Sequence, residues 1–140
     1  VMMHAENGIA IDVLRDQASL RGDTTSIWHG KTRPPELESE ATHRAIQLAI
    51  VANSPLYIVH LSSQKALHEV ARARDAGRNV FAETCPQYLY LSLEEHLDQP
   101  GLDGVRHICS PPLRSSEDGN HDSLWKGLNM AKPTIAAAIP

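Results

Sequence analysis

The sequence has little of three features that would each point to a particular class of protein. Only two of its 140 residues are cysteines, Cys85 and Cys109, which is too few for a disulfide scaffold, so we expect two reduced thiols. No apolar run approaches the ~20 residues that span a bilayer. No charged leader followed by an apolar segment is present either. We therefore expect a cytoplasmic protein without a membrane partner.

The chain also lacks an excess of positive charge. Its 13 lysines and arginines are scattered among 17 acidic residues, and the net charge is -4 with histidine neutral. Nucleic-acid binding needs a basic surface that neutralises phosphates, so we expect no nucleic-acid partner. A complete (β/α)8 barrel takes about 250 residues. With 140 residues, the chain is expected to be a fragment, residues 1–140, of one catalytic barrel domain.

Strand-like and helix-like segments alternate through the first half of the sequence. Strands are expected within 1–6, 56–59 and 80–83, and helices at 8–20, 36–53 and from Ser62 or Ser63 to Gly77. A polar loop is expected at 23–35, a long irregular connection after Cys85, an amphipathic helix at 122–130 and an apolar end at 135–140. This βαβ rhythm predicts the α/β class, with parallel strands alternating with helices in a partial TIM barrel.

The buried stripes of the first two long helices can be predicted from their spacing. For 8–20 the expected stripe is Ala10, Val13, Leu14, Gln17 and Ala18; for 36–53 it is Leu37, Ala41, Ala45, Leu48, Ala49 and Ala52. Glu36, Glu38 and Glu40 would then lie at the positive end of the helix dipole. The run 56–59 is apolar throughout, which is typical of a parallel strand covered on both faces.

Two histidines occupy corresponding places in two strand–helix units. His4 and His60 each follow a strand-like run, and the carboxyl ends of parallel strands meet at the functional face of a barrel. Imidazole is the commonest biological metal ligand near neutral pH, so we predict that the pair holds a divalent metal. Glu6 and Ser62 lie two residues further on, where either could orient a ring. Glu83 ends the third strand and could face the same mouth, or it could bind a backbone amide or an arginine.

No other side chain is predicted to take part in the chemistry. We expect the remaining histidines to be solvated: His29, His43, His68, His96, His107 and His121. The sequence contains no nucleophile elbow and no glycine-rich phosphate loop, so we assign no catalytic nucleophile, acid or base.

Five motifs, in order, resemble those of the dihydropyrimidinase and D-hydantoinase family. They are His4-Ala5-Glu6-Asn7-Gly8, Arg33-Pro34-Pro35-Glu36 with Glu38, Glu40 and Ala41, Val59-His60-Leu61-Ser62, Glu83-Thr84-Cys85-Pro86-Gln87-Tyr88-Leu89, and Ser110-Pro111-Pro112-Leu113-Arg114. The separation of His4 from His60 is similar to that of the family's two late metal-binding histidines. The resemblance covers the chain from Val1 to about Leu128.

The resemblance implies a metal-dependent amidohydrolase barrel with two zinc ions per complete active site. His4 and His60 match the histidines of one ion, and Ser110 matches the serine whose backbone helps to hold the cyclic amide substrate. The implied reaction opens a hydantoin or dihydropyrimidine to an N-carbamoyl amino acid, and the implied assembly of the full-length enzyme is a homotetramer. One alternative is an allantoinase or dihydroorotase, because the runs 60–63 and 83–86 also look like those relatives. Another is a non-catalytic dihydropyrimidinase-related adaptor, a class that is similar in fold but lacks metal ligands.

The sequence departs from the family pattern in three places. It has no His-x-His pair, Lys31 and Lys65 are not in the context of the bridging carboxylated lysine, and nothing acidic follows Asp122. We therefore expect at most one, incomplete, zinc site, and we expect the 140 residues alone to be inactive, because catalytic zinc usually takes three protein ligands.

Overall fold

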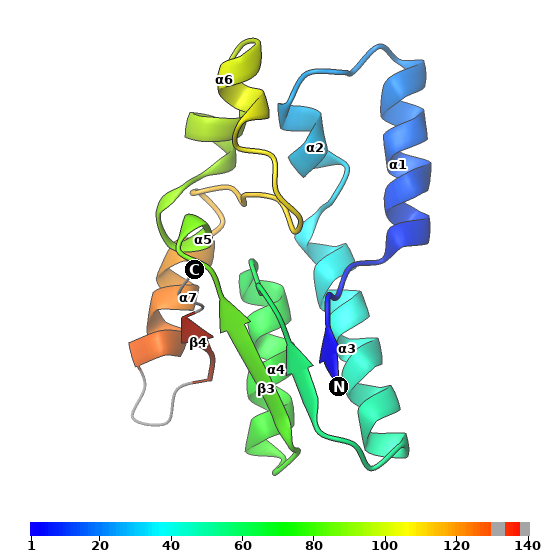
Figure 1. Ribbon diagram of the computed structural model, residues 1–140, viewed down its shortest axis with the longest axis vertical. Helices are drawn as coiled ribbons and strands as arrows, with labels where there is room; N and C mark the ends of the chain where they lie inside the picture. The colour runs from blue at the N-terminus through cyan, green and yellow to red at the C-terminus, as the bar shows by residue number, and fades with distance from the viewer. Residues whose placement is uncertain (130–133, 138–140) are drawn as a thin grey trace.

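Four parallel strands form one sheet in the order β1-β2-β3-β4 (Figure 1). The computed structural model describes residues 1–129 and 134–137. The elements are β1 (Met2–Met3), α1 (Gly8–Leu20), α2 (Ile27–Lys31), α3 (Pro35–Val51), β2 (Leu56–Ile58), α4 (Gln64–Asp75), β3 (Val80–Thr84), α5 (Gln87–Tyr90), the π-helix η1 (Leu93–Leu97), α6 (Leu102–Val105), α7 (Asn120–Asn129) and β4 (Ala136–Ala137).

The strand order distinguishes a barrel from an open doubly wound sheet. Each new strand is added at the same edge: β1 pairs with β2, β2 with β3, and β3 with β4, all in parallel. A doubly wound sheet reverses its order at a switch point, whereas a (β/α)8 barrel always adds the next strand beside the last. The chain therefore has the fold of a partial (β/α)8 barrel, as the sequence predicted.

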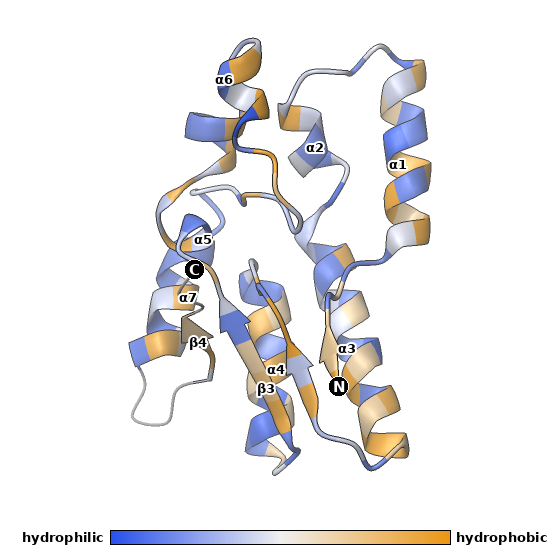
Figure 2. Ribbon diagram, viewed as in Figure 1, coloured by the Kyte–Doolittle hydropathy of each residue, from blue (hydrophilic) through white to orange (hydrophobic). Residues whose placement is uncertain are grey.

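Helices α3 and α4 cover one face of the sheet. They pack against each other, and they contact β2 and β3 respectively (Figure 1). Leu56 and Ile58 of β2, like Val80 and Ala82 of β3, are buried on this face, whereas Phe81 on the other face is 46% exposed. The strand predicted to be covered on both faces is 56–59, and there Leu56 and Ile58 are buried whereas Tyr57 and Val59 are only partly buried, so within the described residues the covering is complete on one face alone. Figure 2 shows the hydrophobic residues along β2 and β3, with hydrophilic colour at the carboxyl end of β3.

Helix α3 begins and ends close to the prediction but is rotated from the predicted stripe. Pro35 occupies its first turn, where a missing N–H costs nothing. Its buried residues are Glu38, Ala41, Thr42, Ala45 and Ile46. Leu48, predicted to be inside, is 62% exposed. The rotation brings Glu38 into the interior, where it forms an ion pair with Arg114.

The other predicted helices are confirmed with smaller corrections. Helix α1 buries Ile11 and Ala18 and leaves Val13 52% exposed, because it touches the rest of the molecule along a narrow stripe. Ser63 caps α4 by accepting a hydrogen bond from the N–H of Ala66, which settles the choice between the two serines. Helix α7 ends at Asn129; Met130 and residues 138–140 lie outside the described residues.

Several short helices lie beyond the carboxyl ends of the strands. The predicted loop at 23–35 contains α2, and the irregular region after Cys85 contains α5, η1 and α6. Helices α2 and α6 both contact η1, and together with α1 they form a layer above the sheet (Figure 1). None of the helices in the described part of the chain is both long and apolar enough to cross a membrane.

Candidate metal centre

His4 and His60 face each other at the carboxyl ends of the first two strands. Nδ1 of His4 lies 3.0 Å from Nε2 of His60, and the two rings meet edge to face with centroids 4.8 Å apart. The parallel register, in which Met3 pairs with Ile58, brings the two strand ends level. Two nitrogens bound to one tetrahedral zinc lie roughly 3.3 Å apart, so this pair fits as two ligands of one ion.

Glu6 holds the far side of the His4 ring. Its Oε2 lies 3.1 Å from Nε2 of His4, and its side chain is only 6% exposed. A carboxylate beside Nε2 keeps the proton on that nitrogen and leaves Nδ1 with its lone pair toward His60. Burial raises the pKa of Glu6, and His4 and Arg114 partly offset the rise. The predicted orienting role of Glu6 thus has a matching contact.

His60 lies in an uncommon backbone conformation. Its φ of 42° is in the left-handed region, which non-glycine residues seldom occupy. Its other ring nitrogen, Nδ1, is buried without a hydrogen-bond partner among the described residues. Burial, together with the neighbouring His4, lowers the pKa of His60, which favours the neutral imidazole that binds metals. Strain and an orphaned nitrogen on one residue are features of functional sites.

Ser62 could have oriented the ring of His60, but its side chain bonds other residues instead. Its N–H donates to Oε1 of Glu38 at 2.7 Å and its hydroxyl donates to Oε2 at 2.9 Å. Arg114 completes the cluster: Nε donates to Oγ of Ser62 at 2.9 Å, and Nη2 lies 2.8 Å from Oε2 of Glu38. The Ser62 hydroxyl therefore donates one hydrogen bond to Glu38 and accepts one from Arg114.

The Glu38–Arg114 pair is the part of this region that sequence reasoning missed. Both residues are buried, at 2% and 4% exposure. The sequence alone predicts that Glu38 interacts with the helix dipole, because it lies in a first turn rich in acids. The available signal was its spacing from Ala41 and Thr42, which places a carboxylate on the packed face of α3.

The described residues supply no third ligand. No group of three or more His, Cys, Asp or Glu side chains that could hold a metal ion occurs among residues 1–129 and 134–137. The two lysines considered in the sequence have other partners: Lys65 pairs with Glu36, and Lys31 lies over the ring of Trp28. The donor set thus fits half of a catalytic zinc shell and leaves the rest to groups outside the described residues.

Glu83 has a partner of its own. Its Oε2 accepts a 2.8 Å hydrogen bond from the hydroxyl of Tyr57 on the neighbouring strand, and this bond is the largest cause of the raised pKa of Tyr57. This carboxylate therefore bonds neither of the alternative partners predicted for it, a backbone amide or an arginine. The Tyr57–Glu83 pair lies on the sheet face that α3 and α4 leave uncovered.

Ser110 is exposed and precedes a cis peptide bond to Pro111. The carbonyl of Pro111 accepts a 2.7 Å hydrogen bond from the buried hydroxyl of Tyr88, which fixes the segment. Cys109 and Cys85 are free thiols whose pKa values burial raises, so both are protonated at neutral pH.

Of the remaining histidines, His68 is exposed as predicted, whereas the other five are only partly exposed and each contacts another group of the chain. His29 and His121 bind the carbonyls of Cys109 and Leu91 at 2.7 and 2.9 Å. His43 contacts Glu69, and the rings of His96 and His107 pack edge to face. These contacts join segments distant in sequence, which spacing along a helix does not reveal.

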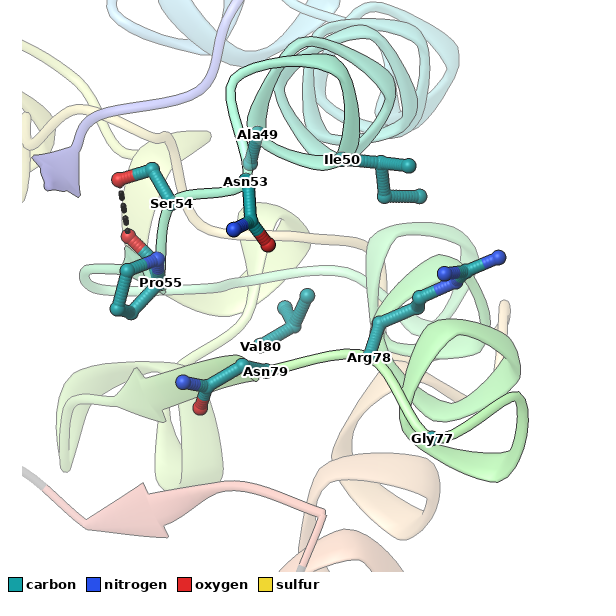
Figure 3. Close-up of a pocket in the computed structure, with 9 residues that line it drawn as sticks. All are labelled: Ala49, Ile50, Asn53, Ser54, Pro55, Gly77, Arg78, Asn79 and Val80. Carbon is teal, nitrogen blue, oxygen red and sulfur yellow. Dashed lines mark hydrogen bonds between the residues drawn. The ribbon is translucent and has the colours of Figure 1, made fainter.

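A cavity of about 230 Å³ lies at the opposite end of the sheet (Figure 3). It is lined by the turn after α3 and the start of β3, including Asn53, Pro55, Arg78 and Val80. The amino ends of barrel strands serve stability rather than chemistry. We therefore place the functional site at the histidine end.

The fold and the paired histidines define a segment of a parallel α/β barrel with two facing imidazoles at the carboxyl ends of adjacent strands. No family model matches the chain. It is 56% identical over 128 residues to a D-hydantoinase from Streptomyces coelicolor and 49% identical over 128 residues to one from Geobacillus stearothermophilus, in each case over 91% of this chain. The crystal structure of a dihydropyrimidinase from Brevibacillus agri matches 98% of the chain with a TM-score of 0.91 and 44% identity.

The chain is therefore homologous to one segment of the D-hydantoinase and dihydropyrimidinase family. It spans 27% of the length of the Streptomyces relative and 29% of the Brevibacillus structure. The resemblance found in the five motifs is confirmed.

Proposed function

We propose that the chain is part of one catalytic barrel domain of a metal-dependent hydrolase that opens cyclic amides. The observation that carries this proposal is the 3.0 Å approach of Nδ1 of His4 to Nε2 of His60 at the carboxyl ends of adjacent barrel strands. The names of the relatives support the substrate class, hydantoins or dihydropyrimidines. In a complete active site the cofactor would be two zinc ions, of which these histidines would hold one.

The zinc ions would supply Lewis-acid activation of water and of the ring carbonyl. The other roles that can be assigned belong to residues of this chain. His4 and His60 would each present a ring nitrogen to the ion, and Glu6 would hold the Nε2 side of the His4 ring. The backbone of Ser110 would bind the cyclic amide. In the reaction, the ring C–N bond breaks, hydroxide adds to the carbonyl carbon and a proton goes to the leaving nitrogen, which yields an N-carbamoyl amino acid.

The chain by itself is proposed to be inactive, because two ligands do not complete a catalytic shell. The full-length protein is proposed to work in the cytoplasm as a homotetramer on a small-molecule substrate. An allantoinase or dihydroorotase activity remains the enzyme alternative. A metal-free adaptor is disfavoured, because both histidines are present and face each other.

A chimera tests the function directly. This chain replaces the matching segment of the Streptomyces D-hydantoinase, and hydrolysis of hydantoin, dihydrouracil, allantoin and dihydroorotate is measured. We expect hydrolysis of the first two, loss of activity and of one zinc equivalent with His4→Ala or His60→Ala, and no loss with His68→Ala as the matched control. A folded chimera that binds zinc but opens only allantoin or dihydroorotate would overturn the substrate class. One that keeps its zinc without His60 would overturn the site.

A further inference from the structure

Residues 37–40, near the start of α3, hold the chain segments that follow both candidate ligands. After β1, the N–H of Asn7 donates to the carbonyl of Leu37 at 3.2 Å and its amide donates to Oε2 of Glu40 at 2.8 Å. After β2, Ser62 donates through its N–H and its hydroxyl to Glu38. Asn7 lies three residues after His4, and Ser62 lies two residues after His60. One helical turn thus fixes two loops.

Arg114 makes the second of these attachments rigid. Its guanidinium bonds Glu38, Ser62 and the carbonyl of Arg33, so it touches the helix, the turn after β2 and the segment before α3. Glu38, Ser62 and Arg114 are all at most 4% exposed. A buried ion pair is weak evidence for stability, because desolvation of both charges can exceed their attraction. The bonds of this pair to Ser62, however, also fix the position of the turn after β2.

The turn at His60 depends on this attachment. Before it, Val59 N–H donates to the carbonyl of Met3 at 3.2 Å; after it, Leu61 N–H donates to the carbonyl of Glu83 at 2.7 Å. Between these bonds His60 has a φ of 42°, which costs energy for a residue with a side chain. Such a conformation persists only where its surroundings determine it, and the next contact along the chain is Ser62 with Glu38.

We propose that Glu38 is a positioning residue for the metal site. With Arg114, it holds the turn after β2 so that Nε2 of His60 faces Nδ1 of His4. This inference rests on the proposed function, in which those two nitrogens share an ion. Because Arg114 also ends the segment that begins with Ser110, the same cluster joins the ligand-bearing turn to the segment proposed to bind substrate.

The test uses the 140-residue chain and two variants, Glu38→Gln and Ser62→Ala. Glu38→Gln keeps the size of the side chain but removes its charge, and Ser62→Ala removes only the hydroxyl bonds. Two quantities are measured: the NMR contact between the rings of His4 and His60 without metal, and the dissociation constant for Co²⁺. For Glu38→Gln we expect loss of the ring contact and an affinity at least about tenfold weaker, as for other groups that orient ligands. Ser62→Ala should change both in the same direction by less.

Two controls separate positioning from general damage. Val70→Ala creates a cavity beneath α4, where Val70 is fully buried, and should lower stability without changing the ring contact or the affinity. Glu69→Gln removes a carboxylate from the outer His43–Arg72 cluster and should change neither readout.

The proposal is overturned if folded Glu38→Gln keeps both the ring contact and the Co²⁺ affinity of the parent. If Glu38→Gln does not fold, an unchanged Ser62→Ala overturns it in the same way. A parent chain that shows the ring contact but binds no Co²⁺ contradicts the proposed metal site instead, and the ring contact in the variants then decides the role of Glu38.

Discussion

Glu38 and Arg114 are 76 positions apart in the sequence, yet their charged groups lie 2.8 Å apart in the interior. The pair joins the first turn of α3 to the segment that follows the cis peptide bond. Since neither charge is exposed to water, each depends on the other for its neutralisation.

Removal of one partner should therefore be costly. We expect Arg114→Met to lower the free energy of unfolding by about 3–5 kcal/mol, because it leaves a buried carboxylate without a counter-charge. Adding Glu38→Gln to that variant removes the charge and should recover part of the loss, since glutamine still accepts from the Ser62 N–H. Urea unfolding measures both. The control Arg44→Met breaks the exposed Glu40 pair and should cost about 1 kcal/mol or less; an equal cost at both sites would contradict the prediction.

His29 should make stability depend on pH. Burial lowers its pKa from the ordinary 6.5, and Arg33 adds to this effect, although the bond to Cys109 opposes it. The folded chain then binds less proton at this site than the unfolded chain. The contribution is fully present above about pH 6.5 and is lost as the pH falls from the unfolded-state pKa through the lowered folded-state pKa. The free energy of unfolding should therefore decrease more between pH 8 and pH 5.5 in the parent than in His29→Gln. Parallel pH profiles of the two proteins would argue against this assignment.

Gly104 should not tolerate a side chain. A Cβ at this position would lie 2.5 Å from the carbonyl oxygen of Gln99 and 2.7 Å from that of Leu97, and backbone atoms do not give way as a flexible side chain does. We expect Gly104→Ala to lower the free energy of unfolding by about 1–3 kcal/mol. Gly8 is the matched control, because a Cβ there meets nothing within 4 Å. Gly8→Ala should leave the melting temperature unchanged or raise it, and a similar loss from both substitutions would show that sterics at Gly104 are not the cause.

Zinc should stabilise the folded chain through the histidine pair. A ligand at one hundred times its dissociation constant adds about 2.7 kcal/mol to the free energy of unfolding if it binds only the folded state. We expect zinc to raise the melting temperature, a chelator to reverse the rise, and His60→Ala to abolish it. His68→Ala should behave as the parent does. A rise that persists in His60→Ala would locate the ion elsewhere.

The alternation of strands and helices could be predicted because each element shows its own period or its own cap. Ser63 and Gly77 mark the two ends of α4, and Gly77 has the positive φ, 72°, expected after a helix. The facing of His4 and His60 could also be predicted, because equivalent positions in successive barrel units share one rim.

The parts that could not be predicted depend on distant partners. The burial of Glu38 requires Arg114, and without that partner the helix would be expected to turn Leu48 inward instead. Helix α2 has only five residues in a polar stretch, too few to show a period, and it is held by contact with η1. His29 and His121 bind backbone carbonyls 80 and 30 positions away, which local patterns do not encode.

The attachment of two loops to one turn of α3 has a mechanical consequence. If this helix tilts or slides, Asn7 and Ser62 travel with it, and both imidazoles are displaced in the same direction. The gap between the rings is then preserved while their placement over the sheet changes. A molecule that presses on the outer surface of α3 would thus move the pair as one body.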